Sequence, residues 1–322
     1  MSLKQGLLLV IFLKFLICGF SQEVKKDKTP TEINFGLYQI AWGSHQFATQ
    51  LKKTIDLLPK KPTYIMFFRD MHLKREFPSE FIEIINDIKA KPIVSLELGI
   101  WGQKNKNILK EIIAGKHDPF FINWFKKCKK WKKDVYIRPG FEMNGDWFDW
   151  GGDPKKFKQS WKHIHALSQK EKCQNLKWIW SVNCRSFPDK DWNKIIHYYP
   201  GDQYVDILGV DGYNWTNELP WRKDTVTQSF NQVFDQTMKD FSKISKDKPI
   251  LITEISCAET KSLKKSKWID NFFKKVNHYP NITGFIWFNY DKRKEKEPDW
   301  RINSSESSLK SFKNGLKFPF IK

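Results

Sequence analysis

The sequence predicts a single (β/α)8 TIM barrel of the α/β class. Eight strand-length apolar runs alternate with helix-length amphipathic stretches, which is the pattern of a parallel sheet covered by helices. The chain has 322 residues, a length that one such barrel can fill. No glycine-rich phosphate loop follows the first run, so the pattern favours a closed barrel over an open dinucleotide-binding sheet.

The strands are predicted where apolar and aromatic residues form short runs between polar segments. The predicted strands are Phe35–Trp42, Thr63–Phe68, Pro92–Leu98, Val135–Glu142, Leu176–Val182, Val205–Tyr213, Pro249–Ile255 and Ile282–Asn289. Active sites of such barrels lie at the carboxyl ends of the strands, so residues at these ends are candidates for function. The candidates found there are Asp70, Glu97, Glu142, Asn183, Asp211, Tyr213, Glu254 and Trp287.

The helices are predicted where apolar residues recur at spacings of three and four. These segments are Phe81–Ile88, Leu109–Trp131, Phe157–Leu167, Phe230–Phe241, Trp268–Val276 and Leu309–Leu316. The last of them would close the ring. The chain has no internal repeat beyond the alternation and no low-complexity linker, so residues 23–322 are expected to form one domain.

Residues 1–22 are predicted to be a secretory signal peptide. Lys4 precedes the apolar stretch Leu7–Phe20, and small residues stand before the expected cleavage site. An uncleaved anchor is the alternative, but Lys14 interrupts the stretch. We therefore expect a secreted, extracellular protein with no membrane span after signal removal. Four cysteines would remain, and we expect Cys128 and Cys173 to pair, because both close helices that precede neighbouring strands.

The formal net charge of +20 raises the question of a nucleic-acid or polyanion partner. The positive residues are mostly lysines spread over predicted helix faces, and no nucleic-acid-binding motif accompanies them. We therefore interpret them as a solvated surface and expect no nucleic-acid partner. Affinity for an acidic polysaccharide or another negative surface stays open, and it would show as steep salt dependence.

Two glutamates at strand ends carry the functional hypothesis. Glu142 ends the fourth predicted strand among Phe141, Trp147 and Phe148, and Glu254 follows a strand without internal charge. Two carboxylates across an aromatic-lined cleft are the usual groups for hydrolysing a glycosidic bond. Burial among aromatic rings raises a carboxyl pKa, as a general acid requires. Each glutamate alone is equally consistent with a structural ion pair.

Tryptophans near the strand ends support a sugar substrate. Sugar rings have apolar faces that stack on indoles, although a single tryptophan is more often a packing residue. The six near the predicted strand ends are Trp147, Trp150, Trp180, Trp215, Trp287 and Trp300. Histidine and cysteine spacings match neither a metalloprotease site nor an activated thiol, so no catalytic metal is expected.

In these motifs the chain resembles glycoside hydrolase family 26, which contains β-mannanases, β-1,3-1,4-glucanases and β-1,3-xylanases. The resemblance covers residues 35–312. Its motifs are the segment around Glu142, Trp180-Ser181-Val182-Asn183, Val205–Trp215, Thr253-Glu254, Gly284–Asn289 and Asp299–Ser305.

The resemblance implies a retaining mechanism in which Glu142 is the acid/base and Glu254 the nucleophile. Tyr213 would orient the nucleophile by hydrogen bonding. The positions that match sugar-binding residues of the family are Arg138, Asn144, Trp147, Trp287, Trp300 and Arg301. The resemblance also implies that no metal or organic cofactor takes part. The expected partner is a polysaccharide, and we expect a monomer.

The chain departs from the mannanases of the family at one position. Phe141 stands where they commonly carry a histidine, and the end of strand three, Glu97-Leu98-Gly99, also lacks one. The first hypothesis is an endo-β-1,4-mannanase, and a β-1,3-1,4-glucanase, another β-glucanase or a β-1,3-xylanase is the alternative within the family. A carbohydrate-binding protein on the same scaffold that no longer cuts is the alternative from another class.

Overall fold

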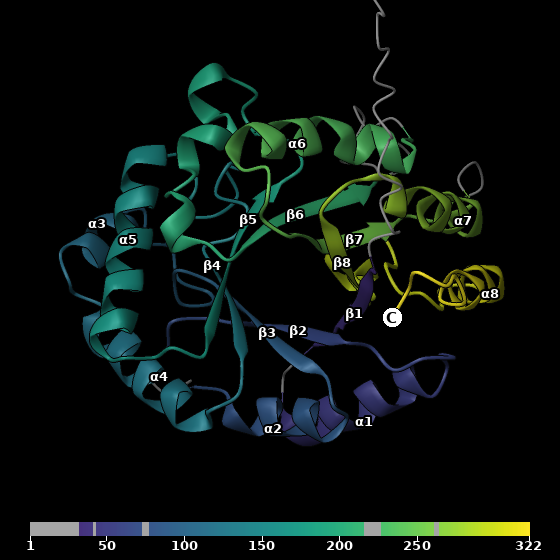
Figure 1. Cartoon of the computed structure of the whole chain (residues 1–322), viewed down its shortest axis with the longest axis horizontal. Helices are drawn as coiled ribbons and strands as arrows, with labels where there is room; N and C mark the ends of the chain where they lie inside the picture. Colours follow the sequence, from purple (N-terminus) through teal and green to yellow (C-terminus); the bar gives the residue numbers. More distant parts are fainter. Residues whose placement is uncertain (1–31, 41–42, 73–76, 216–226, 261–263) are drawn as a thin grey trace, which may run out of the picture.

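The computed structural model describes residues 32–40, 43–72, 77–215, 227–260 and 264–322. The predicted signal peptide and the last two residues of the first predicted strand lie outside these ranges. Strands close a ring around one axis, and helices surround the ring (Figure 1).

The sheet is a closed barrel in which each strand pairs in parallel with its neighbours in sequence order. The first strand pairs with the last, Phe35 opposite Phe285, and closes the ring. The strands are β1 Asn34–Tyr38, β2 Tyr64–Arg69, β3 Lys91–Leu96, β4 Val135–Pro139, β5 Leu176–Asn183, β6 Ile207–Asn214, β7 Ile250–Cys257 and β8 Ile282–Trp287. The predicted fold class and all eight predicted strands are confirmed.

The helices are α1 Ser44–Ile55, α2 Ser79–Asp87, α3 Ile108–Ile113, α4 Asp118–Trp131, α5 Pro154–Lys170, α6 Phe230–Ile244, α7 Lys265–Lys275 and α8 Glu306–Gly315. Several begin at residues with clear capping chemistry. The Asp153 carboxylate accepts the backbone N–H of Lys156 at the start of α5, which Pro154 opens. Ser229 and Gln232 form a reciprocal capping box at the start of α6.

Two helix predictions were wrong. The segment Leu109–Trp131 forms two helices instead of one, because the chain turns at Gly115, whose φ is +78°. The strict alternation also fails between β5 and β6, where the described chain forms three short 3-10 helices, the first at Asp191–Asn193. That linker is rich in polar, proline and aromatic residues and lacks an apolar stripe of helical spacing.

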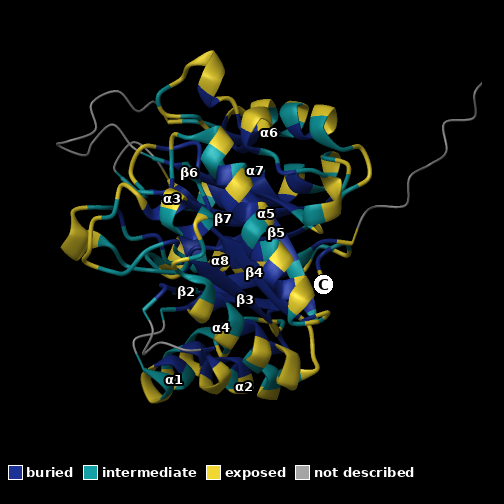
Figure 2. Ribbon diagram, turned by 90° about the vertical axis from the view of Figure 1, so that its left-hand side faces the viewer, coloured by how far each residue is buried: buried dark blue, intermediate teal, exposed yellow. Residues whose placement is uncertain are grey.

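The core lies inside the barrel and between the sheet and the helices, where buried residues are concentrated (Figure 2). Aromatic rings fill much of the space behind β8. Phe272 of α7 packs edge-on against Phe285 at a centroid distance of 4.8 Å and against Phe230 of α6 at 5.1 Å. Truncating such a fully buried ring to alanine costs about 3–5 kcal/mol, so these contacts fix the helices on the sheet.

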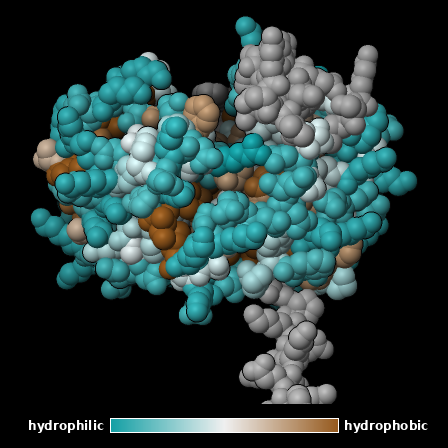
Figure 3. Space-filling model, turned by 90° about the horizontal axis from the view of Figure 1, so that it is seen from above, coloured by the Kyte–Doolittle hydropathy of each residue, from teal (hydrophilic) through white to brown (hydrophobic). Residues whose placement is uncertain are grey.

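Apart from the buried Lys265, the described lysines are exposed or half-buried. Hydrophilic residues cover most of the face in Figure 3, with hydrophobic residues gathered near its middle. Among the residues that the structure describes, no helix is both long and apolar enough to span a bilayer.

The expected disulfide is not formed. All four described cysteines are free thiols, although Cys128 and Cys173 are both buried and lie close enough to hydrogen-bond each other. Asn175 contacts both, because its amide donates to the Cys128 carbonyl oxygen at 2.9 Å and its side-chain oxygen accepts from the Cys173 thiol at 3.5 Å. The prediction that Cys128 and Cys173 lie close together is therefore confirmed, and the prediction of a disulfide between them is wrong.

Candidate active site

Glu142 stands on a tight turn after β4 instead of on the strand itself. The strand ends at Pro139, and Gly140 and Glu142 both adopt left-handed backbone conformations, with φ of +57° and +52°. A non-glycine residue in this region stores strain, which persists where the surroundings fix it. The Glu142 N–H donates to the Ser181 carbonyl of β5 at 3.0 Å, and this contact helps to hold the turn.

The Glu142 carboxyl is held through both of its oxygens. Asn183 donates its side-chain amide to Oε1 at 2.6 Å, and the Trp147 indole N–H donates to Oε2 at 2.8 Å. Burial raises the pKa of Glu142 to about 7, and the charge of Glu254 acts in the same direction. The hydrogen bonds from Asn183 and Trp147 lower the pKa of Glu142, but by less than burial raises it. A carboxyl with this pKa can donate a proton near neutral pH.

Glu254 lies within β7, on the inner side of the barrel mouth, and is only 5% exposed. The pairing of β6 with β7 shifts register between Val210 and Asp211, which places Asp211 opposite Glu254. Arg138 Nη2 donates to Glu254 Oε1 at 2.5 Å, and the Tyr213 hydroxyl donates to Oε2. Burial, followed by the charge of Glu254, raises the pKa of Tyr213 well above its usual value, so this hydroxyl stays a donor.

Arg138 is fully buried and joins two carboxylates. Its Nη1 donates to Asp211 Oδ1 at 2.9 Å while Nη2 holds Glu254, and its guanidinium lies 4.2 Å from the Phe141 ring centroid. Thr253 also donates to Asp211, at 2.7 Å. Burying a charge is costly unless it is paired and hydrogen-bonded, and these contacts meet that condition. Arg138 therefore positions Glu254 from beneath.

The two glutamates differ in environment as an acid and a nucleophile should. Glu142 is partly exposed, accepts only neutral donors and has a raised pKa. Glu254 accepts from a guanidinium and a hydroxyl, which stabilise its charged form. A carboxyl with a raised pKa beside one that is held by a guanidinium is the arrangement expected of a general acid and a nucleophile.

The predicted sugar-binding residues separate into exposed and buried groups. Trp147 is 41% exposed beside Glu142. Asn144, Trp287 and Trp300, like Arg138, have no exposed surface. The Asn144 amide bonds to both the carbonyl and the N–H of Asn183, and the Trp287 indole donates to the Trp300 carbonyl. In this structure these four residues support the site from behind, and direct contact with sugar stays a prediction.

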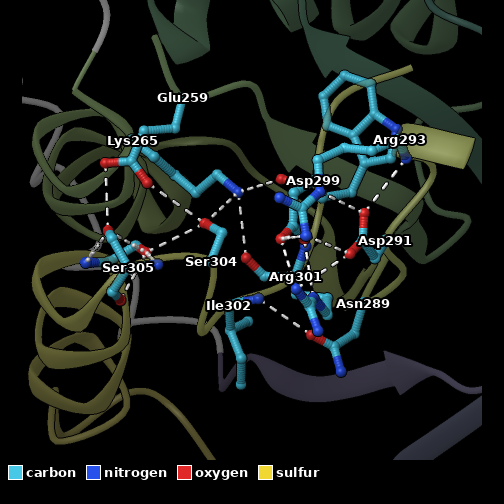
Figure 4. Close-up of polar contacts among 12 residues, drawn as sticks. Glu259, Lys265, Asn289, Asp291, Arg293, Asp299, Arg301, Ile302, Ser304 and Ser305 are labelled. Atoms are coloured by element: carbon cyan, nitrogen blue, oxygen red, sulfur yellow. Dashed lines mark hydrogen bonds and ion pairs between the residues drawn. The ribbon is translucent and has the colours of Figure 1, made fainter. Parts of the chain in front are cut away.

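Arg301, the remaining predicted residue, belongs to a charged cluster on the segment after β8 (Figure 4). It pairs with Asp299 at 2.6 Å and with Asp291 at 3.1 Å, and its side chain keeps 37% of its surface exposed. Buried Lys265 donates to the Asp299 and Arg301 carbonyls at 2.6 and 3.1 Å. These contacts flank Trp300, whose ring packs on Tyr213 at 5.0 Å.

Two residues take part in the site without having been given a role from the sequence. Asn183 holds Glu142, and Asp211 holds Arg138. Both were recognisable only as polar residues at strand ends, and their partners become visible once β4 to β7 are placed side by side. Within the described ranges, no group of three His, Cys, Asp or Glu side chains is arranged to hold a metal ion.

A (β/α)8 barrel with two such carboxyls at its mouth defines a protein of the glycoside hydrolase class. The model described as Glycosyl hydrolase family 26 matches residues 111–293, more than half of the chain. The chain belongs to glycosyl hydrolase family 26.

The proteins similar in sequence include an endoglucanase and mannan endo-1,4-beta-mannosidases. Endoglucanase H of Acetivibrio thermocellus is 30% identical over 214 residues, which cover 64% of this chain and 23% of that protein. Mannan endo-1,4-beta-mannosidase A and B of Caldalkalibacillus mannanilyticus is 28% identical over 166 residues, covering 48% of this chain and 28% of that protein. The chain thus spans about a quarter of the length of these two relatives.

Solved structures share the fold along most of the chain. A beta-mannanase from Bacteroides ovatus superposes with a TM-score of 0.65 at 18% identity, covering 91% of this chain and 90% of that one. The catalytic domain of an endo-beta-1,4-mannanase from Bacillus sp. JAMB-750 gives 0.66 at 17% identity, with 90% and 87% covered. At these identities the likeness establishes the fold.

Proposed function

We propose that the protein is a retaining endo-β-glycanase in which Glu254 is the nucleophile and Glu142 the acid/base. The observation that carries the proposal is the contrast between the two carboxyls. Arg138 and Tyr213 stabilise the charge on Glu254, whereas burial keeps Glu142 protonated up to a pH of about 7. The same division of roles is what the resemblance to family 26 implies for these two positions.

In the first step, a Glu254 oxygen attacks the anomeric carbon while the bond from that carbon to the leaving oxygen breaks. Glu142 transfers its proton to the leaving oxygen, so the departing sugar leaves as a neutral alcohol. The products are a glycosyl ester on Glu254 and an ionised Glu142. Arg138 loses part of its charge partner in the ester, and Asp211 keeps it paired.

In the second step, Glu142 acts as a base. It takes a proton from water while the water oxygen attacks the anomeric carbon and the ester bond to Glu254 breaks. Two displacements at the same carbon retain its configuration. Both glutamates return to their starting protonation states, and no cofactor is needed to balance the reaction.

The proposed substrate is β-1,4-mannan. Support comes from the relatives named mannan endo-1,4-beta-mannosidase and from the mannanases that share the fold. The exposed Trp147 beside Glu142 offers an indole face to a sugar ring. Export through the predicted signal peptide would bring the protein to such a polymer, and secretion stays a prediction.

A mixed-linkage β-glucan is the second candidate because of Phe141. Its ring is 3% exposed and lies under Arg138 and against Phe68 and Trp150, so the side chain at this position offers no polar group to a substrate. The mannanases of the family commonly carry a histidine there. The match to Endoglucanase H also covers more of the chain than the match to the mannosidase of Caldalkalibacillus mannanilyticus.

Product release from a panel of polymers tests the proposal. Purified protein and Glu254→Gln are incubated with galactomannan, glucomannan, lichenan, carboxymethyl cellulose and β-1,3-xylan, and reducing ends are measured. We expect release from a mannan or a mixed-linkage glucan by the wild type, and none by the variant. Equal release by both proteins would refute the assignment of Glu254. Binding without release on every polymer would favour a carbohydrate-binding protein.

A further inference from the structure

A buried lysine stands at the start of α7. Lys265 is the first residue of this helix, and its side chain has no exposed surface. A positive charge is unfavourable at a helix N-terminus, where the helix dipole already leaves partial positive charge, and burial adds a second cost. The first turn of α7, Lys265–Trp268, contains no acidic residue that would offset these costs. A charge placed in this way is expected to have specific partners and, at many such sites, a function.

The partners of Lys265 are three oxygen atoms on the segment after β8 (Figure 4). Its Nζ donates to the Asp299 carbonyl at 2.6 Å, to the Arg301 carbonyl at 3.1 Å and to the Ser304 hydroxyl at 2.8 Å. An ammonium group has three N–H donors, so each donor has one acceptor. Burial lowers the pKa of Lys265 to about 8, so the group is still mainly charged at pH 7. The lysine therefore fastens α7 to the segment after β8.

Trp300 lies between the two carbonyls that Lys265 binds, and its own backbone groups are also held. Its carbonyl accepts from the Ser256 hydroxyl at 2.8 Å and from the Trp287 indole at 2.9 Å. Its N–H donates to the Tyr290 carbonyl at 3.0 Å. The carbonyls of three consecutive residues are thus bound by side chains of β7, β8 and α7. These contacts fix the direction in which the Trp300 side chain leaves the backbone.

The Trp300 ring is buried against the residue that contacts the candidate nucleophile. It packs on the Tyr213 ring at a centroid distance of 5.0 Å and edge-on against Trp215 at 4.8 Å. Phe288 contacts Tyr213 at 5.6 Å, so the phenol ring has an aromatic neighbour on each of two elements. The Tyr213 hydroxyl donates to Glu254. Contacts therefore run without interruption from Lys265 through Trp300 and Tyr213 to Glu254.

We propose that Lys265 is a positioning residue for the nucleophile. By holding the backbone on both sides of Trp300, it keeps that ring packed on Tyr213, and it thereby keeps the Tyr213 hydroxyl on Glu254. Lys265 acts through these two aromatic residues and takes no part in the proton transfers. The inference rests on the proposed glycanase function and adds a positioning residue to it.

A double-mutant cycle tests whether Lys265 acts through Tyr213. Lys265→Met removes the three donors and keeps a side chain of similar length. On the polymer that the protein cuts best, we expect this change to lower kcat about tenfold in the wild-type background and less than twofold in Tyr213→Phe, because residues that act through one another do not have additive effects. A tenfold loss in both backgrounds would overturn the proposal, since a merely structural role would be additive.

The separate values of kcat and KM distinguish positioning of the nucleophile from sugar binding. We expect the loss in Lys265→Met to be in kcat, with KM within about threefold of wild type. A raised KM at unchanged kcat would place the effect of Lys265 on substrate binding and would overturn the proposal. Lys267→Met is the matched control, because Lys267 is exposed on the same turn of α7. We expect its kcat to stay within twofold of wild type, and a loss equal to that of Lys265→Met would refute a specific role.

Lys265→Gln covers the case in which Lys265→Met does not fold, which circular dichroism and urea unfolding would show. The amide of this variant has two N–H donors for the carbonyls where the ammonium has three. We expect a kcat about threefold below wild type, and no further loss when the same change is made in Tyr213→Phe. A kcat equal to that of wild type, or a threefold loss in both backgrounds, would overturn the proposal.

A measurement without substrate separates this inference from the glycanase function. In protein labelled with 3-fluorotyrosine, the ¹⁹F resonance of Tyr213 is identified by its loss in Tyr213→Phe. We expect this resonance to shift or broaden in Lys265→Met and to keep its position in Lys267→Met. An unchanged Tyr213 resonance in Lys265→Met would overturn the proposal. The expected change in a protein that hydrolyses no polymer would support the contact between Lys265 and Tyr213 through Trp300 and count against the glycanase function alone.

Discussion

Replacing Trp147 by phenylalanine should move the alkaline limit of activity to higher pH. The Trp147 indole donates to Glu142 Oε2 at 2.8 Å and lowers the pKa of that carboxyl by stabilising its charged form. Phenylalanine keeps an aromatic face and removes the donor. With the donor gone, the ionised form of Glu142 is less stable, and the proton is held to higher pH.

The size of the shift follows from the contact. A hydrogen bond to a charged group contributes about 1.5–3 kcal/mol, and we discount this to about 1 kcal/mol because water can replace part of it at a residue that is 41% exposed. Since about 1.4 kcal/mol corresponds to one pKa unit, the apparent pKa should rise by about 0.7, from about 7.

The assay is kcat/KM against pH, from initial rates at substrate concentrations well below KM. The alkaline limb reports the acid of the free enzyme. Trp192→Phe is the control, because Trp192 is also exposed, at 49%, but lies on the β5–β6 linker. An alkaline limb that stays in place in Trp147→Phe, or moves to lower pH, would refute the assignment of Glu142 as the acid.

Three further predictions concern two residues that contact Glu254 and the buried Lys265. Tyr213→Phe removes the hydroxyl that donates to Glu254 and should lower kcat about 100-fold, while the free energy of unfolding in urea falls by only about 1–3 kcal/mol. A kcat within twofold of wild type would contradict the orienting role. Arg138→Met leaves Asp211 and Glu254 buried without their shared partner. The free energy of unfolding, measured by urea titration, should therefore fall by about 3–5 kcal/mol. A loss below about 1 kcal/mol would contradict the ion-pair account. Burial lowers the pKa of Lys265 from 10.5 to about 8. Between pH 8 and pH 10.5 the lysine is therefore protonated in the unfolded state and largely neutral in the folded state, so the free energy of unfolding should rise with pH over this range. The unfolding free energy of wild type relative to Lys265→Met should therefore increase by about 3 kcal/mol from pH 7 to pH 10.5, and a pH-independent difference would refute the buried charge.

The strands could be predicted from the sequence because a parallel barrel buries both faces of each strand and produces continuous apolar runs. The run Pro249–Ile255 is an example, and β7 covers nearly the same residues. The helix break at Gly115 was harder to predict, because apolar residues continue at helical spacing on both sides of it. A single glycine inside such a pattern is compatible with either a turn or a helix interior.

The charged residues of the candidate site could be predicted from the sequence, but the exposure of its tryptophans could not. Glu142 and Glu254 could be recognised from the sequence because burying a carboxylate at the end of an apolar strand costs free energy. Such a residue is therefore expected to have an ion-pair partner or a function. Trp287 and Trp300 follow the same sequence pattern as Trp147, yet they are buried. Their orientation depends on tertiary contacts, such as the Trp287 indole bonding to the Trp300 carbonyl, which no local pattern encodes.

The most direct test of the account is to trap the covalent intermediate. The protein is incubated with 2,4-dinitrophenyl 2-deoxy-2-fluoro-β-mannobioside and with the corresponding cellobioside, whose fluorine slows the breakdown of the ester, and its peptides are analysed by mass spectrometry. The account predicts that the peptide containing Glu254 gains the mass of one fluorinated disaccharide and that Glu254→Gln gains none. A label on any other residue, or no label on a protein that cuts the polymer, would contradict a retaining mechanism through Glu254.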